Sequence, residues 1–203
     1  MKYELSLLAE AAPETFLNAV LHSLEQDVPE ILEMFCEGDD YIGQTSYHVG
    51  LLWALEQLAW LPEYILEASL ILLKLARLDP GGNSHNRPIN SLQEIFKPWH
   101  YQTLTTFKDR MTVLSRIAKK EKESGWNLLT ALLPPNNDIA LSTDKMKWRT
   151  FETNTILTYS GLEVYNTYAA ILDLLFELFD DNEEKFAQML QKVPELPSAL
   201  RQK

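Results

Sequence analysis

The fold of this chain is decided by residues 55–103, LEQLAWLPEYILEASLILLKLARLDPGGNSHNRPINSLQEIFKPWHYQT. Two apolar segments are joined there by a polar segment rich in glycine, proline and asparagine. Between Leu61 and Leu78 the only charged residues are Glu63, Glu67, Lys74 and Arg77. Their spacing places all of them on one narrow stripe of an α-helix. A helix that is apolar around the rest of its circumference packs against several neighbours, so the sequence predicts a helical stack.

A helical hairpin pattern recurs along the chain. Residues 9–17 align with residues 58–66, and each stretch ends one helix, turns, and starts the next with Pro-Glu. Proline and an acidic residue both suit the first turn of a helix. Looser copies occur at 117–126 and 193–195. Single hairpins cannot bury both faces but arrays can, so the sequence predicts an all-α fold of stacked hairpins, an α-solenoid or superhelix without a sheet. The alternative is chance similarity between helices rich in leucine and alanine.

The length and the turn signals indicate one helical-repeat domain over residues 1–203, with long loops at about 79–90 and 134–147. A chain of 203 residues is long enough to bury a large core without disulfides. After the first loop, a capping-box pattern at Ser91–Glu94 predicts the start of a short helix. After the second loop, a single polar stripe predicts a helix over 161–179 that is buried on most sides, and a last helix covers about 183–192.

The net charge of −11 is concentrated in the first third of the chain. Residues 1–73 contain thirteen acidic residues and one basic residue, Lys2. Such a surface repels nucleic acid and attracts a basic partner or a basic neighbouring segment, or it serves only solubility. Six basic residues crowd one later helix, but acidic residues alternate with them, so we expect an ordinary charged helix face. They are Lys108, Arg110, Arg116, Lys119, Lys120 and Lys122.

The sequence favours a cytoplasmic protein with no membrane contact. The single cysteine, Cys36, excludes an internal disulfide and fits a reducing compartment. The first residues are acidic where a secretory signal would be apolar. The longest run without charge, residues 41–55, is fifteen residues long and contains several polar residues, so it is too short for a membrane span.

Motifs for catalysis or cofactor binding are weak in this sequence. The seven glycines form no phosphate-binding loop, the four histidines are widely separated, and no serine lies in a nucleophile motif. We therefore predict no catalytic site, no cofactor, no metal and no enzyme activity. One alternative is an all-α enzyme that holds magnesium with Asp180, Asp181 and Glu184, which match a DDxxE pattern. The competing interpretation is that Asp181 and Glu184 cap a helix.

The polar loop is the best candidate for an interaction site. Aspartate and asparagine bind local backbone and arginine pairs with carboxylates, so these side chains predict an ordered network. That network either contacts a ligand or only orders the connection so that the following helix docks. A Trp-Arg pair in the second loop presents the same choice. The candidate residues are Asp79, Gly81, Gly82, Asn83, Asn86, Arg87, Trp99, Trp148 and Arg149.

Several segments in this order resemble a known family. They are residues 8–20 (LAEAAPETFLNAV), 51–103, 125–134 (GWNLLTALLP), 145–152 (KMKWRTFE) and 186–200 (FAQMLQKVPELPSAL). They resemble the helical C-terminal region of large bacterial STAND-type NTPases, some of which are antiviral sensors. The block DPGGN, NRP, SL, IF and PW within 79–99 is the most specific part.

The resemblance implies a role in sensing foreign proteins. In that family the helical region recognises a foreign (phage) protein, and an N-terminal NTPase module and an effector domain respond. This chain has neither a Walker A loop nor an effector motif. We therefore expect a non-catalytic recognition or scaffold segment whose partners are a foreign protein or neighbouring modules of the same polypeptide. A purely structural spacer is the remaining alternative.

Overall fold

The structure, a computed structural model, describes residues 4–35, 47–82, 85–134, 139–148 and 159–202. These residues form α-helices and short 3-10 helices and contain no β-strand, so the predicted all-α class is confirmed. The helices are α1 (Glu4–Ala11), α2 (Pro13–Leu24), η1 (Glu30–Phe35), α3 (His48–Ala59), α4 (Ile65–Leu78), α5 (Pro88–Phe96), α6 (Phe107–Lys120), α7 (Lys122–Leu132), α8 (Gly161–Leu178), α9 (Glu183–Lys192) and η2 (Val193–Glu195). None of the described helices is long and apolar enough to cross a membrane.

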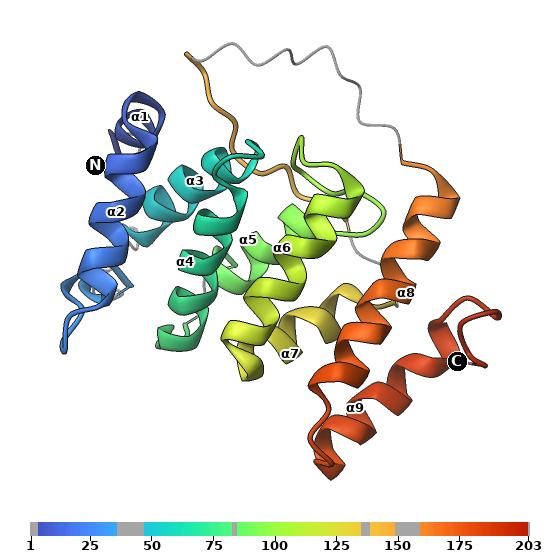
Figure 1. Ribbon diagram of the computed structural model, residues 1–203. Coiled ribbons are helices and arrows are strands. Elements are labelled where there is room, and N and C mark those ends of the chain that lie inside the picture. Colours follow the sequence, from blue (N-terminus) through green and yellow to red (C-terminus); the bar gives the residue numbers. More distant parts are fainter. Residues whose placement is uncertain (1–3, 36–46, 83–84, 135–138, 149–158, 203) are drawn as a thin grey trace.

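The helices follow one another across the molecule from α1 and α2 at one end to α8 and α9 at the other (Figure 1). Neighbours in the chain contact each other: α1 packs on α2, α3 on α4, α4 on α5, α6 on α7 and α7 on α8. Contacts between α1 and α3, and between α4 and α6, join successive pairs. This order is compatible with stacked hairpins, and the regular superhelix stays a prediction.

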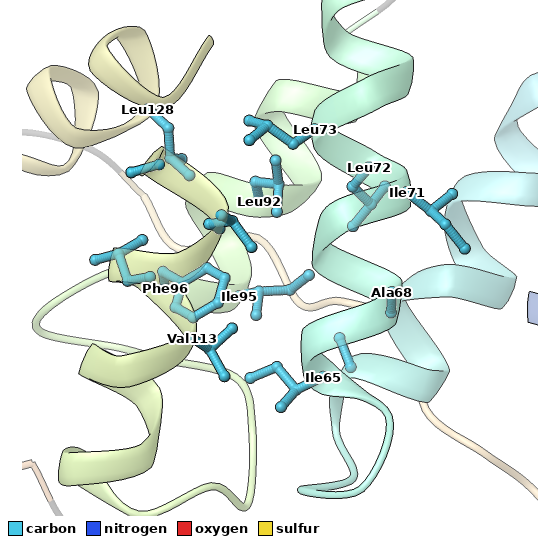
Figure 2. Close-up of a cluster of buried hydrophobic side chains, with 14 of the residues drawn as sticks. Ile65, Ala68, Ile71, Leu72, Leu73, Leu92, Ile95, Phe96, Val113 and Leu128 are labelled. Carbon is cyan, nitrogen blue, oxygen red and sulfur yellow. The ribbon is translucent and has the colours of Figure 1, made fainter. Parts of the chain in front are cut away.

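Helix α4 lies at the centre of the core. It contacts α2, α3, α5, α6 and α7, and its buried face includes Ile71, Leu72 and Leu73. Figure 2 shows Ile71 and Leu73 on opposite sides of α4, with Leu92 of α5 and Leu128 of α7 on the side of Leu73. The charged residues of α4 remain at least partly exposed. The burial predicted from the single polar stripe of residues 61–78 is therefore confirmed.

Two predicted helix starts are wrong by about one turn. Pro62 and Glu63 lie in a turn, and α4 begins at Ile65. Helix α5 begins at Pro88 and not at Ser91, so the first loop ends at Arg87 instead of residue 90. Proline occupies the first turn of α5, where its fixed φ and missing N–H suit a helix start. Ser91 therefore does not cap the helix, and its hydroxyl donates to Glu56 instead.

A buried arginine joins α6 to the start of α8. Arg110 is 2% exposed, and its Nη2 lies 2.6 Å from Oε1 of Glu163. Its Nη1 donates to the carbonyl of Thr105 at 3.2 Å, and its guanidinium lies 3.5 Å from the centre of the Tyr101 ring. Arg110 is thus an exception to the solvent-facing role expected for the basic residues of this helix. Removing one member of such a pair leaves a buried charge without compensation.

Helices α6 and α7 meet through a glycine. A Cβ atom at Gly125 would lie 2.5 Å from the Cα and 2.7 Å from the carbonyl oxygen of Ala118. Backbone atoms cannot move away as a flexible side chain does, so only glycine allows this close approach. The single residue Glu121 separates the two helices, which makes the contact possible.

We expect Gly125→Ala to lower the free energy of unfolding by about 1–3 kcal/mol, because the added methyl group overlaps backbone. Gly161→Ala is the matched control, since a Cβ there meets nothing within 4 Å. That control should stabilise the protein by about 0.4–1 kcal/mol through reduced entropy of the unfolded chain. Urea unfolding followed by circular dichroism measures both. Equal effects of the two substitutions would contradict the close contact between α6 and α7.

Candidate functional site

The first polar loop is ordered by a buried ion pair. Arg87 is buried, and its Nη1 donates to Oδ1 of Asp79 at 3.0 Å. The same oxygen accepts the backbone N–H of Gly81 at 3.0 Å. Gly81 and Gly82 have φ of 81° and 142°, a conformation that favours glycine. These contacts of Asp79, Gly81 and Arg87 lie within the first polar loop, and they fix the conformation of its backbone.

The other predicted candidates lie in different surroundings. The carbonyl of Asn86 accepts a hydrogen bond from Nε2 of the buried His48 at 2.9 Å. Trp99 is half-buried, and the Lys97 ammonium lies 5.2 Å from the centre of its ring. Trp148 is 77% exposed and far along the chain from that loop. Asn83 and Arg149 lie outside the described residues.

Part of the predicted second loop forms an irregular, stretched-out segment that we call the strap, residues 139–148. The strap crosses α5 and α3 and reaches α1 (Figure 1). It contains neither helix nor strand. Such a segment needs hydrogen-bond partners for its backbone from elsewhere, because it makes no ladder of its own.

Side chains of the helices and of the loop after α5 supply those partners. Gln102 bonds two backbone groups at once: its Nε2 donates to the carbonyl of Leu141 at 2.7 Å, and its Oε1 accepts the N–H of Thr143 at 2.8 Å. Glu94 accepts the N–H of Leu141 at 3.0 Å. At the far end, Glu10 accepts the N–H of Lys147 at 2.9 Å, and the N–H of the next residue as well. The sequence pattern does not indicate these contacts, because they join residues far apart in the chain.

A small polar cavity of about 70 Å³ lies between α3, α5 and the strap. The carboxylate of Glu56 stands at its wall and accepts the Ser91 hydroxyl at 2.6 Å and the N–H of Asp144 at 3.1 Å. Eleven residues line this cavity: Trp53, Glu56, His85, Asn86, Arg87, Asn90, Ser91, Glu94, Leu141, Ser142 and Thr143. Two of them, Asn86 and Arg87, belong to the predicted loop site.

The pKa of Glu56 is raised above its ordinary value. Burial is the main cause, and the negative charges of Asp144 and Glu94 add to it. The hydrogen bonds from Ser91 and from the Asp144 N–H act in the opposite direction and offset part of the rise. The folded protein therefore binds a proton at Glu56 more tightly than the unfolded chain does.

The sign of this shift gives a pH prediction. The contribution of Glu56 to the free energy of unfolding is most favourable below its unfolded pKa and falls as the pH rises through the folded pKa. The amide in the variant Glu56→Gln cannot ionise, so the variant should gain stability relative to the wild type as the pH rises from about 4 to about 7.5. Urea unfolding of both proteins across this range measures the difference. Parallel stability curves would show that Glu56 is ionised in the same way in the folded and unfolded states.

The carboxylates proposed for magnesium binding are arranged differently from the predicted motif. The Nζ of Lys185 lies 3.0 Å from Oδ2 of Asp180 and lowers the pKa of that carboxyl. The side chain of Asn182, rather than Asp181, caps α9 by accepting the N–H groups of Glu184 and Lys185. In the described part of the chain no three histidine, cysteine, aspartate or glutamate side chains gather as metal ligands.

An apolar groove of about 120 Å³ lies at the α8–α9 end of the molecule. We call it the C-terminal groove. Three of its side chains remain about half exposed: Phe176 at 52%, Phe186 at 53% and Leu190 at 53%. Its only charged lining residue among the described residues is Arg201. The complete lining is Leu133, Leu172, Phe176, Phe186, Met189, Leu190, Val193, Leu196, Leu200 and Arg201.

The exposure of Phe176 differs from the prediction that α8 is buried on most sides. One face of α8 packs on α6 and α7 and buries Leu172 and Leu175. The flank with Phe176 lines the C-terminal groove instead. The pattern of one polar stripe predicts burial, but it does not show whether the burying partner belongs to the same chain.

Comparisons with protein-family models, with curated proteins and with solved structures find no match to this chain.

Proposed function

We propose that this chain is a non-catalytic helical module that binds a partner protein through the C-terminal groove. The observation that carries the proposal is the half-exposed apolar lining of this groove. Contiguous apolar surface of this kind on a folded protein is typical of interaction sites. The proposal includes a cytoplasmic location, which the composition favours.

The side chains that line the groove are arranged like one half of a contact between two helices. On α9 and the turn after it, Phe186, Met189, Leu190 and Val193 follow the spacing of three, four and seven that forms one helical face. Terminal units of stacked-hairpin proteins need a polar outer face to stay dispersed in water. This end of the stack is apolar instead, so we propose that a helix of the partner packs here and continues the stack.

The partner helix is amphipathic and carries a carboxylate. Arg201 is exposed at the groove, and its Nε donates to the carbonyl of Leu196 at 2.8 Å. This bond orients the guanidinium beside apolar side chains. An acidic residue at the edge of the partner's apolar face pairs with it, as in other complexes in which a helix lies in a groove.

The resemblance to STAND-type NTPases supports a specific setting for this module. In that setting the partner is a neighbouring module of the same polypeptide or a recognised foreign protein, and the catalytic domains lie elsewhere. The support comes from the sequence segments quoted above.

The groove is tested with synthetic helical peptides. The probe is a fluorescent, stapled helix of about four turns with leucines on one face and a glutamate at its edge, and a second probe carries lysine in place of glutamate. We expect the glutamate probe to bind more tightly, and Leu190→Glu to weaken its binding by about tenfold or more because it places a charge in the groove. Leu162→Glu is the control. Leu162 is exposed like Leu190, but it lies on α8 and does not line the groove.

Charge reversal provides the decisive comparison. Arg201→Glu should reverse the order of the two probes, so that the lysine probe binds more tightly. Thermal melts confirm that each variant is folded. If both probes bind the wild type, Leu190→Glu and Leu162→Glu equally, the groove is not the docking site.

The non-catalytic role gives a separate prediction. The 203-residue chain should release no phosphate from ATP above the rate of a buffer blank, because nothing in its sequence matches a phosphate-binding loop. A coupled phosphate assay measures this. Turnover that copurifies with the wild type and disappears in Arg87→Ala would contradict the proposal.

A further inference from the structure

The rest of the fold holds the strap mainly by its main chain. Gln102 has both a donor and an acceptor on one amide, so it can bridge a carbonyl and an N–H two residues apart in a stretched-out chain. Glu56 and Glu94 each accept another strap N–H, and Gln57 donates to the carbonyl of Lys145 at 3.3 Å. Main-chain groups are common to all sequences, so a surface that binds them accepts more than one segment.

Few strap side chains are buried. Thr143 and Met146 are, and the Thr143 hydroxyl accepts a hydrogen bond from Nε1 of Trp60 at 2.9 Å. Ile139 and Leu141 are exposed although they are apolar. The surface also binds the Asp144 side chain, since Nε2 of Gln57 donates to Oδ2 of Asp144 at 2.6 Å. The side-chain requirement is therefore a hydroxyl residue, an acceptor at the next position, and an unbranched apolar residue three positions after the hydroxyl.

The charge of the surface favours a basic segment. Its acceptors include the carboxylates of Glu10, Glu56 and Glu94, and two of these belong to the acidic first third of the chain. The strap brings Lys145, whose ammonium lies 4.1 Å from the centre of the Trp60 ring, and Lys147. Lysine above a tryptophan ring is a favourable cation–π contact.

We propose that the surface beneath the strap is a binding channel for stretched-out basic polypeptide segments, which the chain occupies with its own residues 139–148. A segment of another protein with the same pattern takes the place of the strap. The channel is separate from the C-terminal groove, so either proposal can fail without the other.

Because the strap is covalently attached, it protects the channel from binding by other segments. An attached segment competes at an effective concentration on the order of millimolar, so a free peptide competes poorly with it. Removing a buried anchor of the strap lowers this protection but leaves the polar side chains of the channel in place. Met146→Asp is such a change, since Met146 is a buried residue of the strap itself and the substitution leaves Gln102, Glu56 and Glu94 intact.

The experiment adds the strap back as a separate molecule. The probe is the fluorescently labelled peptide IALSTDKMKW, the sequence of residues 139–148, titrated by anisotropy into the wild type and into Met146→Asp. We expect binding to Met146→Asp to be tighter by about tenfold or more, because the attached competitor is weakened. Adding Gln102→Ala to that variant should reduce the affinity by about tenfold or more, because both bridging bonds are lost.

Two N-methylated peptides test whether the channel binds the main-chain N–H groups of the peptide. Methylation at the position of Thr143 removes the N–H that binds Gln102, and it should abolish binding. Methylation at the position of Ser142 is the control, because the contacts described for the strap do not use that N–H, and it should leave the affinity nearly unchanged. Equal losses for the two peptides, or no binding to a folded Met146→Asp chain, overturn the proposal.

A second variant is used if Met146→Asp does not fold. If Met146→Asp does not give the circular dichroism spectrum of the wild type, the same peptides are titrated into Thr143→Ala. If neither variant is folded, the wild type is used at millimolar peptide, and the two methylated peptides must still differ there. The absence of that difference overturns the proposal as well.

Discussion

The structure depends on one constraint, which is that α4 is apolar around most of its circumference and must be enclosed. Among the described helices it contacts α2, α3, α5, α6 and α7, and Leu92 of α5 and Leu128 of α7 lie on the side of Leu73 (Figure 2). Enclosure on several sides requires neighbours in front of and behind α4, and the row of helices in Figure 1 follows from this requirement. The close approach at Gly125 and the buried guanidinium of Arg110 fix the later helices against this centre.

The strap and the C-terminal groove differ in how their side chains are covered. Across α1, α3 and α5, buried polar side chains such as Glu56 and Gln102 require partners, and the chain supplies its own main chain. Between α8 and α9 the edge is apolar, and Phe176 and Phe186 remain half exposed. The polar side chains beneath the strap thus bond main-chain groups of the same chain, whereas the apolar side chains of the C-terminal groove remain about half exposed.

The fold class could be predicted from the sequence because helical periodicity is a local property. The stripe in residues 61–78 indicated the burial of α4, and the ends of the last two helices agree with their predicted positions within one residue. Turn chemistry was less reliable: at Ser91 a capping-box pattern competed with Pro88, and the proline determined the helix start. The strap could not be predicted, because its contacts join residues far apart in the chain. One signal was present, since Glu56 and Gln57 interrupt an otherwise apolar helix and buried polar residues need partners.

The reach of the strap has a consequence for the cooperativity of unfolding. Glu10 is 4% exposed, and two of the N–H groups that it binds lie 137 and 138 residues downstream. Helix α1 and the strap therefore form a contact of very long range, and such contacts form late in folding because the intervening chain must first be ordered. Loss of the strap would deprive the buried Glu10 carboxylate of these two donors, so we expect α1 and the strap to separate from the fold together.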